Sequence, residues 1–297
     1  MQPRLTTVKR YDKIALSSTK LKGRGKKMKH NDTRRQIIIQ ALRTSKKLSI
    51  EQAMQTLDVS ESTVRRLFAQ LENEGLVIRT YGGICFNESV LGAENYSFEH
   101  TQLYFQQEKS RIGAAAAQLI QTGDIIYLDS GTTVMSLCDE IDRIFTASGE
   151  SEYQDFKKML ETVTVFTHSL VNLNLLKNHI KVYLIGGEYR DGRRDFCGYL
   201  TEEAIKNLRF TKCFVGADGY SEDMGILASD FGTARINQIV AQNSAYRILL
   251  VDSSKYKKSS VVCYAPFSEV NCIVTDTGLD SDVCERFRGS GVDVITI

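Results

Sequence analysis

Hydroxyls and guanidinium groups are concentrated in one short stretch of the sequence, SESTVRR, and a further arginine follows it. A guanidinium group can donate two hydrogen bonds to a guanine edge or can grip backbone phosphates, and hydroxyls can bond to either. These residue types at this spacing favour contact with double-stranded DNA. The candidate DNA-binding residues are Ser60, Ser62, Thr63, Arg65, Arg66 and Arg79.

Two amphipathic helices must present these side chains. Apolar residues recur at helical spacing from Ile50 to Leu57, and again at Val64, Leu67, Phe68 and Leu71. The turn Asp58-Val59-Ser60 lies between them and ends in a hydroxyl that can cap the next helix. An ordinary pair of surface helices with solvated arginines would show the same periodicity, so the helices alone do not establish DNA binding.

A hairpin after the second helix favours the DNA-binding interpretation. Asn73-Glu74-Gly75 ends the helix, and the run Leu76 to Tyr81 precedes a predicted two-residue turn, Gly82-Gly83. An earlier amphipathic segment, residues 33–43, is expected to form a helix that packs beneath the reading pair. Together these features predict a winged helix-turn-helix.

This stretch resembles the DNA-binding part of the DeoR-type bacterial transcription regulators. The resemblance rests on Val59-Ser60-Glu61, Thr63-Val64-Arg65-Arg66, Leu71-Glu72, Gly75-Leu76, Arg79 and Gly82-Gly83. It implies a helix-turn-helix motif at about residues 48–67 that binds a DNA operator. Leu67 departs from the pattern, because most relatives carry an aspartate there, and the departure bears on which bases are read.

Polar or glycine-rich loops follow five apolar runs further along the chain. In the first, Asp129-Ser130-Gly131-Thr132-Thr133 follows the run IIYL and leads into a helix. Glycine allows close backbone approach and a helix N-terminus favours an anion, so this loop could hold a phosphate. A plain capping turn needs the same residue types, and this loop alone does not separate the two. The other loops are Thr167-His168-Ser169, Gly186-Gly187-Glu188, Gly216-Ala217-Asp218-Gly219 and Asp252-Ser253-Ser254-Lys255.

Strands alternate with helices from Glu108 onward, which predicts an α/β domain with a mostly parallel sheet covered on both faces. Ligands bind at the carboxyl ends of such strands, so the five loops are expected to converge on one site. The acidic segment 146–161 is expected to be a surface insertion. We expect strands at residues 125–129, 163–167, 182–185, 212–216, 246–252 and 272–275, and helices at 109–121, 170–177, 204–207 and 234–243.

The same loops, in the same order, resemble the effector domain of the DeoR-type regulators. With the first resemblance, the match covers roughly residues 29–296, including Glu108-Lys109, Ile112-Gly113, Gly225-Ile226-Leu227 and Thr275-Asp276. It implies a sugar-phosphate sensor with a fold akin to that of ribose-5-phosphate isomerase. The residues implied in effector binding are Lys109, Asp129, Ser130, Gly131, Thr132, Thr133, Thr167, His168, Ser169, Gly186, Gly187, Asp218 and Lys255.

Two positions depart from the family pattern. His168 stands where relatives usually carry asparagine, and Thr233 stands where they generally carry an acidic residue. Both are expected to face the sugar, so the effector is expected to differ from those of well-known relatives. A histidine there could titrate near neutral pH, or it could remain a neutral hydrogen-bonding group, which we favour.

A sugar-phosphate isomerase that carries a helix-turn-helix is the competing interpretation. Isomerisation needs a general base beside the C1 or C2 proton, and Asp129 or Asp218 could be placed for this. The sequence lacks a second acidic residue immediately after Gly216-Ala217-Asp218-Gly219, and it lacks the glycine-rich lysine loop of such isomerases. We therefore expect a regulator without catalytic residues, a repressor of a carbohydrate-metabolism operon that a phosphorylated sugar relieves.

Composition indicates a globular protein of two domains in the cytoplasm. The chain has 297 residues, and no apolar run approaches the about 18 residues of a membrane span. Its seven cysteines form no C-x-x-C pair, so we expect reduced thiols and neither a metal site nor a cofactor.

The expected organisation has four parts. Residues 1–28 carry many Lys and Arg against a single Asp12 and are expected to be a disordered extension. This extension could track DNA phosphates, or it could be a functionless tail or an artefact of the assigned start, which we favour. A winged helix-turn-helix follows at 29–86, then a linker at 87–105 and an effector-binding α/β domain at 106–297. A symmetric homo-oligomer, a dimer or tetramer, would place reading helices on repeated half-sites.

Overall fold

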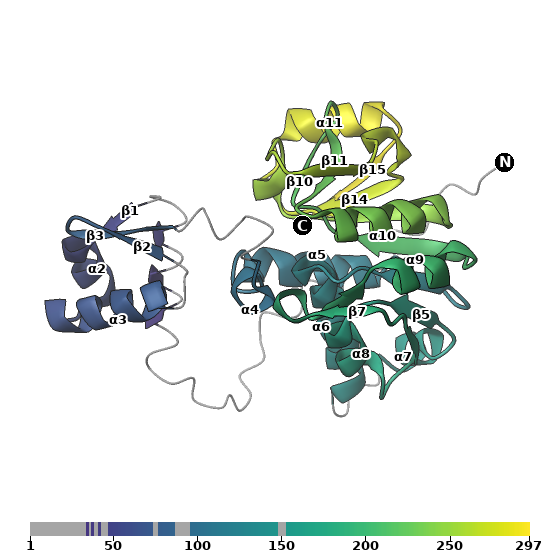
Figure 1. Ribbon diagram of the computed structural model, residues 1–297, viewed down its shortest axis with the longest axis horizontal. Helices are drawn as coiled ribbons and strands as arrows, with labels where there is room; N and C mark the ends of the chain where they lie inside the picture. The colour runs from purple at the N-terminus through teal and green to yellow at the C-terminus, as the bar shows by residue number, and fades with distance from the viewer. Residues whose placement is uncertain are drawn as a thin grey trace. The chain divides into compact units, whose positions relative to one another are not determined.

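The computed structural model describes residues 34–35, 37–38, 41–42, 47–73, 77–86, 96–147 and 153–297 (Figure 1). The chain divides into two compact units between Asn87 and Glu88. The predicted extension at 1–28 lies outside the described residues, as does part of the predicted helix at 33–43. The described residues of that helix are helical, and Ile38 and Leu42 are fully buried.

The N-terminal unit combines two further helices with a three-stranded antiparallel sheet. The first helix begins with a capping box, in which the Ser49 hydroxyl accepts from the Gln52 amide and the Gln52 side chain accepts from the Ser49 amide. The second helix buries the apolar face that the sequence predicts. The elements are β1 (Lys47–Ser49), α2 (Ile50–Leu57), α3 (Glu61–Asn73), β2 (Val77–Thr80) and β3 (Gly83–Phe86), with strand order β1-β3-β2.

The wing differs from its prediction in both its turn and its strand count. Thr80 pairs with Gly83, so the two-residue turn is Tyr81-Gly82 and the predicted turn Gly82-Gly83 is wrong by one residue. Gly82 makes the turn with a φ of +82°, which favours glycine. Gly83 instead allows β1 to approach, because a Cβ there would lie 2.3 Å from the Leu48 carbonyl oxygen. β1 has only three residues, too few for periodicity to reveal it.

A seven-stranded parallel sheet forms the centre of the second unit, in the order β15-β14-β12-β9-β4-β5-β6. This confirms the predicted α/β class, and each predicted strand forms within two residues of its expected bounds. The seventh strand, β15, was not predicted. The strands of this sheet are β4 (Ile125–Leu128), β5 (Thr164–Thr167), β6 (Lys181–Leu184), β9 (Phe210–Val215), β12 (Ser244–Leu250), β14 (Cys272–Thr275) and β15 (Asp293–Thr296).

Helices cover both faces of this sheet. Alternate residues of each strand point to opposite sides: Tyr127 joins one apolar cluster, while Ile126 and Leu128 join the other. The cluster around Tyr127 takes in residues of α9 (Tyr199–Lys206), α10 (Phe231–Gln242) and α11 (Ser281–Gly289). The other takes in residues of α5 (Gln106–Ala117), α6 (Thr132–Thr146), α7 (Gln154–Leu160) and α8 (Leu170–Leu176). Since α7 packs here, part of the predicted insertion at 146–161 belongs to the core.

Smaller elements lie beside the sheet. The strands β7 (Glu188–Arg190) and β8 (Asp195–Cys197) form a hairpin, while β10 (Gly219–Ser221), β11 (Gly225–Ala228) and β13 (Val262–Ala265) form an antiparallel sheet. Before α5 comes the short helix α4 (Phe98–Thr101), inside the segment predicted as a linker. Phe98 is only 3% exposed, so the described end of that segment packs as part of the second unit.

Two helical glycines offer a test of how α5 and α6 pack. A Cβ at Gly113 in α5 would lie 2.3 Å from the Ser136 carbonyl oxygen in α6, whereas a Cβ at Gly289 in α11 meets nothing within 4 Å. We expect Gly113→Ala to lower the free energy of unfolding by about 1–3 kcal/mol, because the helix backbones must separate.

Gly289→Ala is the matched control. It should leave stability unchanged or raise it by up to about 1 kcal/mol through helix propensity. Urea denaturation of both variants measures the difference, and equal effects would contradict close α5–α6 contact.

Candidate functional site

The described part of α3 presents a polar face in which Arg66 differs from the other candidate arginines. Arg65 pairs with Glu61 at 2.6 Å, and Arg79 donates to the Arg65 carbonyl at 2.9 Å. Arg66 is exposed and makes no hydrogen bond or ion pair within the residues that the structure describes. Its guanidinium group can therefore reach a partner without breaking an existing contact.

Hydroxyls complete this face. The Ser60 hydroxyl lies 3.0 Å from that of Ser62 and 3.1 Å from that of Thr63, so the three hydroxyls gather at the start of α3. Leu67, the position that departs from the family pattern, is 3% exposed and packs in the apolar core of the N-terminal unit.

A cavity lies in the second unit where β4 and β9 end and α6 begins. It brings together eight of the thirteen residues proposed from the sequence for effector binding: Lys109, Asp129, Ser130, Gly131, Thr132, Thr133, Asp218 and Lys255. The expected convergence of strand-end loops is thus seen for the loops after β4, β9 and β12. Further lining residues that the sequence did not single out include Tyr96, Thr101, Arg193 and Asn237.

The Asp129 carboxylate organises the cavity floor. One oxygen accepts from the Gly216 amide and from the Asn237 side chain, both at 3.1 Å, and the other accepts from the Ser130 amide at 2.8 Å. The Asn172 side chain donates to the Asp129 carbonyl at 2.9 Å. An ionised carboxylate only accepts hydrogen bonds, so these donors hold Asp129 as a structural hub between β4, β9, α8 and α10.

The N-terminus of α6 opens onto the cavity. Gly131 is the N-cap and has no side chain to cap the helix, and no side chain among the described residues accepts from the amides of the first turn in the described hydrogen bonds. The buried Lys109 ammonium donates to the Thr132 hydroxyl at 2.9 Å, so a cation lies beside these amides. Orphan amides, the positive end of a 15-residue helix and a lysine together suit a bound anion.

Arg193 adds a second cation at the cavity wall. Its guanidinium donates to the Ser229 hydroxyl at 2.7 Å, pairs with Asp230 at 2.9 Å and lies 4.0 Å from the ring centre of Tyr96. Although burial opposes it, Arg193 helps to hold the pKa of the Asp230 carboxyl below its usual value. Asp230 therefore stays ionised and fixes Arg193 in place.

Behind the wall, Arg190 and Asp195 form a buried ion pair. Arg190 donates to both carboxylate oxygens of Asp195, at 2.7 and 2.8 Å, and Ser130 donates to the same carboxylate at 2.7 Å. Arg190 also donates to Thr233, which lines the cavity as the sequence comparison expected of that position. The sequence reasoning missed Arg190, Arg193 and Asp195, although the charge-rich run RDGRRD between two short strands was a usable signal.

The remaining five sequence candidates do not line the cavity. Thr167 donates to the Leu128 carbonyl at 2.7 Å, and Ser169 caps α8 by accepting from the Asn172 amide. Gly186 and Gly187 lie under α9, where a Cβ on Gly187 would be 2.0 Å from the Thr201 hydroxyl. The polar and glycine residues of these loops therefore serve to build the turns at the ends of the strands. This structural role is the alternative to ligand binding that the sequence of each loop left open.

His168, the fifth, is fully buried beneath the cavity floor. Its Nδ1 contacts the Tyr127 hydroxyl, and its Nε2 lies 3.7 Å from Asp195 and 3.9 Å from Asp129. Burial lowers the pKa of His168 despite the two nearby carboxylates. The ring is therefore neutral at physiological pH.

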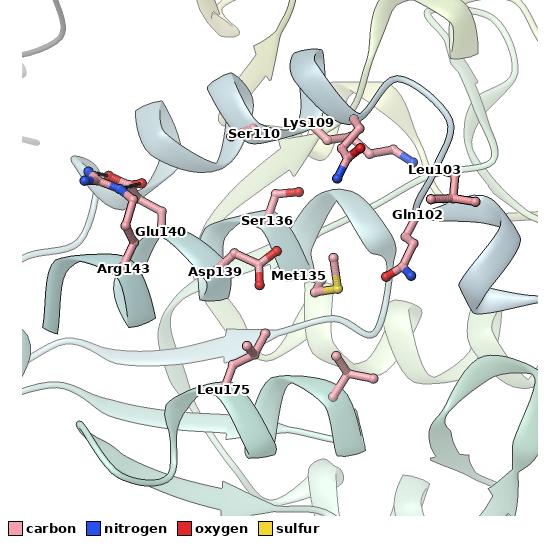
Figure 2. Close-up of a pocket in the computed structure, with 12 residues that line it drawn as sticks. Gln102, Leu103, Lys109, Ser110, Met135, Ser136, Asp139, Glu140, Arg143 and Leu175 are labelled. Carbon is pink, nitrogen blue, oxygen red and sulfur yellow. Dashed lines mark hydrogen bonds and ion pairs between the residues drawn. The ribbon is translucent and has the colours of Figure 1, made fainter. Parts of the chain in front are cut away.

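A second hollow opens on the other side of Lys109, between α5, α6 and α8 (Figure 2). Gln102 and Leu103 form one wall, and Ser136 and Asp139 of α6 form the floor. Burial, reinforced by Asp142, raises the pKa of the Asp139 carboxyl. Lys109 lines both this outer hollow and the cavity at the start of α6, which we call the inner cavity.

Neither a metal site nor a membrane span is evident where the structure can be described. Within those residues, no group of three or more His, Cys, Asp or Glu side chains is arranged to hold a metal ion. No described helix is both long and apolar enough to cross a bilayer.

Comparison with known proteins matches both units. Residues 34–90 match the DeoR-like helix-turn-helix domain, and residues 105–277 match the DeoR C terminal sensor domain. The lactose phosphotransferase system repressor of Staphylococcus epidermidis is 32% identical over 82% of this chain and 90% of its own length. The HTH-type transcriptional regulator IolR of Bacillus subtilis is 30% identical over 79% of this chain and 87% of its own length.

A solved structure, ribose 5-phosphate isomerase A of Methanocaldococcus jannaschii, aligns with a TM-score of 0.36 and 18% identity over 51% of this chain and 54% of that one.

Both domain matches, the similarity to named regulators and the exposed polar face of α3 lead to one conclusion. The chain belongs to the DeoR family of DNA-binding transcriptional regulators, with a helix-turn-helix domain followed by a sensor domain.

Proposed function

We propose that this regulator represses a carbohydrate-metabolism operon and that a phosphorylated sugar, bound in the inner cavity, relieves the repression. The observation that carries the proposal is the Lys109 ammonium, buried 2.9 Å from Thr132 at the open N-terminus of α6. This arrangement suits a phosphate group. Lys255 lines the same cavity and would add positive charge. The names of the relatives, among them a lactose phosphotransferase system repressor, agree with a sugar-related signal.

The rest of the cavity suits the hydroxyls of a sugar. Asp218 and Asn237 line it with an acceptor and an amide, and Arg193 offers donors from the opposite wall. Hydroxyl groups both donate and accept, so such a mixed lining favours a polyol over an apolar ligand. We therefore place the phosphate at residues 130–133 and Lys255, and the sugar towards Asp218.

A sensor role fits the Asp129 carboxylate better than an isomerase role does. A general base needs a free oxygen beside the substrate proton, and both oxygens of Asp129 already accept hydrogen bonds. Asp218 accepts through one oxygen in its described hydrogen bonds, from the Ser229 amide at 2.8 Å, so it is the carboxylate to test. Interconversion of ribose 5-phosphate and ribulose 5-phosphate by the protein, lost on Asp218→Ala, would overturn the proposal that it is not an enzyme.

The site of action follows from DNA binding. As a regulator that reads an operator, the protein would act in the cytoplasm, as a dimer or tetramer that places two α3 helices on related half-sites. On this proposal Ser62, Thr63 and Arg66 face base edges, while Ser60, Arg65 and Arg79 lie nearer the backbone. The four-part division with boundaries at 28, 86 and 105 stays a prediction.

Screening identifies the effector class. Pentose and hexose phosphates would be tested for a rise in melting temperature of the full chain, with the unphosphorylated sugars as controls. Ligand binding to the folded state must raise stability by mass action. Stabilisation by none of the phosphorylated sugars, or equally by the unphosphorylated ones, would contradict the proposed effector.

Arg66→Ala tests the reading face. We expect operator affinity to fall by about 5–150-fold, the cost of losing one bidentate base contact of 1–3 kcal/mol. Affinity would be measured by fluorescence anisotropy on DNA from the region upstream of the gene. Arg65→Ala is the matched control and should cost less, because Glu61 already holds that guanidinium group. Wild-type affinity in Arg66→Ala would show that another surface reads the DNA.

Thr132→Ala tests the phosphate cradle. The hydroxyl that contacts Lys109 is lost, and we expect the dissociation constant of the stabilising sugar phosphate to rise about 10-fold, the loss of one hydrogen bond to a charged group. Operator affinity without ligand should not change. Thr146→Ala, at the exposed other end of α6, is the control for calorimetry. Equal ligand affinity in both variants would move the phosphate elsewhere.

His168→Asn tests the neutral histidine. Because the folded-state pKa of His168 is lowered, the unfolded chain binds the extra proton first as pH falls below about 6.5. The wild-type stability contributed by His168 is therefore complete above that pH and declines below it. Asparagine does not titrate, so the stability of the variant should fall less steeply between pH 7 and about 5. Parallel stability curves from urea denaturation would mean that His168 has an ordinary pKa.

A further inference from the structure

The chain segment that enters the second unit passes over the inner cavity. We define the strap as residues 96–105, which include α4 and lead directly into α5. Tyr96 and Thr101 of the strap line the cavity together with the phosphate cradle. The sequence connects the strap through residues 87–95 to the wing of the DNA-binding unit. Any ligand in the cavity therefore lies beside the segment by which the chain enters the second unit.

Lys109 links the strap to the cradle. Its ammonium donates to the Thr101 carbonyl at 2.8 Å and to the Thr132 hydroxyl at 2.9 Å. The first acceptor belongs to the last residue of α4, and the second belongs to the first turn of α6. One buried cation thus holds the strap against the place where an anion would bind.

Arg193 holds the other end of the strap. Its guanidinium lies over the Tyr96 ring at 4.0 Å and is fixed by Asp230. Burial raises the pKa of the Tyr96 hydroxyl, so the ring stays uncharged under the guanidinium. Gly192 permits this contact, because a Cβ there would lie 2.7 Å from the Tyr96 carbonyl oxygen.

Other contacts also hold the strap. Phe98 is buried, and Glu99 pairs with Arg194 at 2.6 Å on the surface, where an ion pair contributes little. At its far end Phe105 has a φ of +52°, a left-handed conformation that is costly for a bulky residue. The outer hollow runs along this part of the strap, at Gln102 and Leu103, so the strap there has open space beside it (Figure 2).

We propose that the strap is the element through which ligand occupancy acts on the DNA-binding unit, and that Lys109 is the residue shared between strap and ligand. The proposal rests on the proposed function, since it takes the ligand to be a phosphate ester in the inner cavity. A phosphate dianion is a stronger acceptor than a neutral carbonyl, so it draws the ammonium away from Thr101. The strap then loses one of its anchors and loosens.

Thermodynamics requires such a difference between states. A ligand shifts an equilibrium only by its differential affinity for the two arrangements, and couplings are typically 5–150-fold. Here the cation is bound to the strap in one arrangement and to the ligand in the other. The ammonium group has three N–H donors but can occupy only one position, so a phosphate that moves it towards the cradle weakens the bond to Thr101, and the coupling is reciprocal.

Hydrogen–deuterium exchange of the full chain tests the proposal directly. Three amides report on the strap: Thr101 donates to Ser97 at 2.9 Å, Gln102 to Phe98 at 2.9 Å, and Tyr104 to Thr101 at 3.2 Å. The probes are inorganic phosphate and ribose 5-phosphate, with sodium chloride at equal ionic strength as the control. We expect slower exchange at residues 130–135 and at least about 5-fold faster exchange across the strap.

A lysine variant separates the role of Lys109 from that of the ligand. Lys109→Met removes the bond to Thr101, so without any phosphate it should reproduce the fast strap exchange of the bound wild type. Lys177→Met on the exposed surface of α8 removes the same charge and should leave the strap unchanged. Wild-type strap exchange in Lys109→Met would overturn the assignment of Lys109.

The outcomes distinguish this proposal from the one on which it rests. Protection at residues 130–135 with unchanged or slower strap exchange would overturn the strap proposal and leave the phosphate site standing. No protection at residues 130–135 with either probe would contradict the phosphate site, and the strap proposal would fall with it.

Discussion

The sensor unit depends on the buried carboxylate of Asp129. Its two oxygens collect the Ser130 and Gly216 amides and the Asn237 side chain, which come from the end of β4, the end of β9 and the middle of α10. A buried charge without such donors would be strongly destabilising. The same donors fix the loop that begins α6. The geometry of the amides proposed to bind the anion therefore depends on the hydrogen bonds that stabilise the Asp129 carboxylate.

The charges around the cavity explain why it can still attract an anion. Asp195 is compensated by Arg190 and Ser130, and Asp230 by Arg190 and Arg193. Carboxylates paired in this way contribute little net repulsion. Lys255 lines the cavity without a carboxylate partner among the described ion pairs, and the Lys109 ammonium lies beside the first turn of α6. Both lysines therefore bring positive charge to the side of the cavity where the phosphate is proposed to bind.

The sequence predicted the elements that depend on local pattern. Six of the seven strands of the parallel sheet, the buried face of α3 and the loop at residues 129–133 all carry their signal within a few residues. What it missed depends on contacts between distant segments. Arg193 contacts Tyr96 from a hairpin that lies almost a hundred residues later in the chain. The short strand β1 becomes apparent only through its pairing with β3, in which Ser49 lies opposite Gly83. Gly187 shows the reverse error, since glycine is needed there for packing against Thr201 of α9 and not for a ligand.

The position of the strap bears on how a sensor of this kind can act without a large rearrangement. The cavity is built on rigid strand ends, which a small ligand has too little binding energy to repack. One of the contacts that hold the strap, the bond between Lys109 and Thr101, uses an ammonium group that a bound anion would also attract. Because a local segment opens at a lower free-energy cost than the whole domain, competition for one ammonium group can change how often the strap opens. The effector needs only to favour one arrangement of the strap, and the affinity of the DNA-binding unit for its operator can then depend on the sugar phosphate.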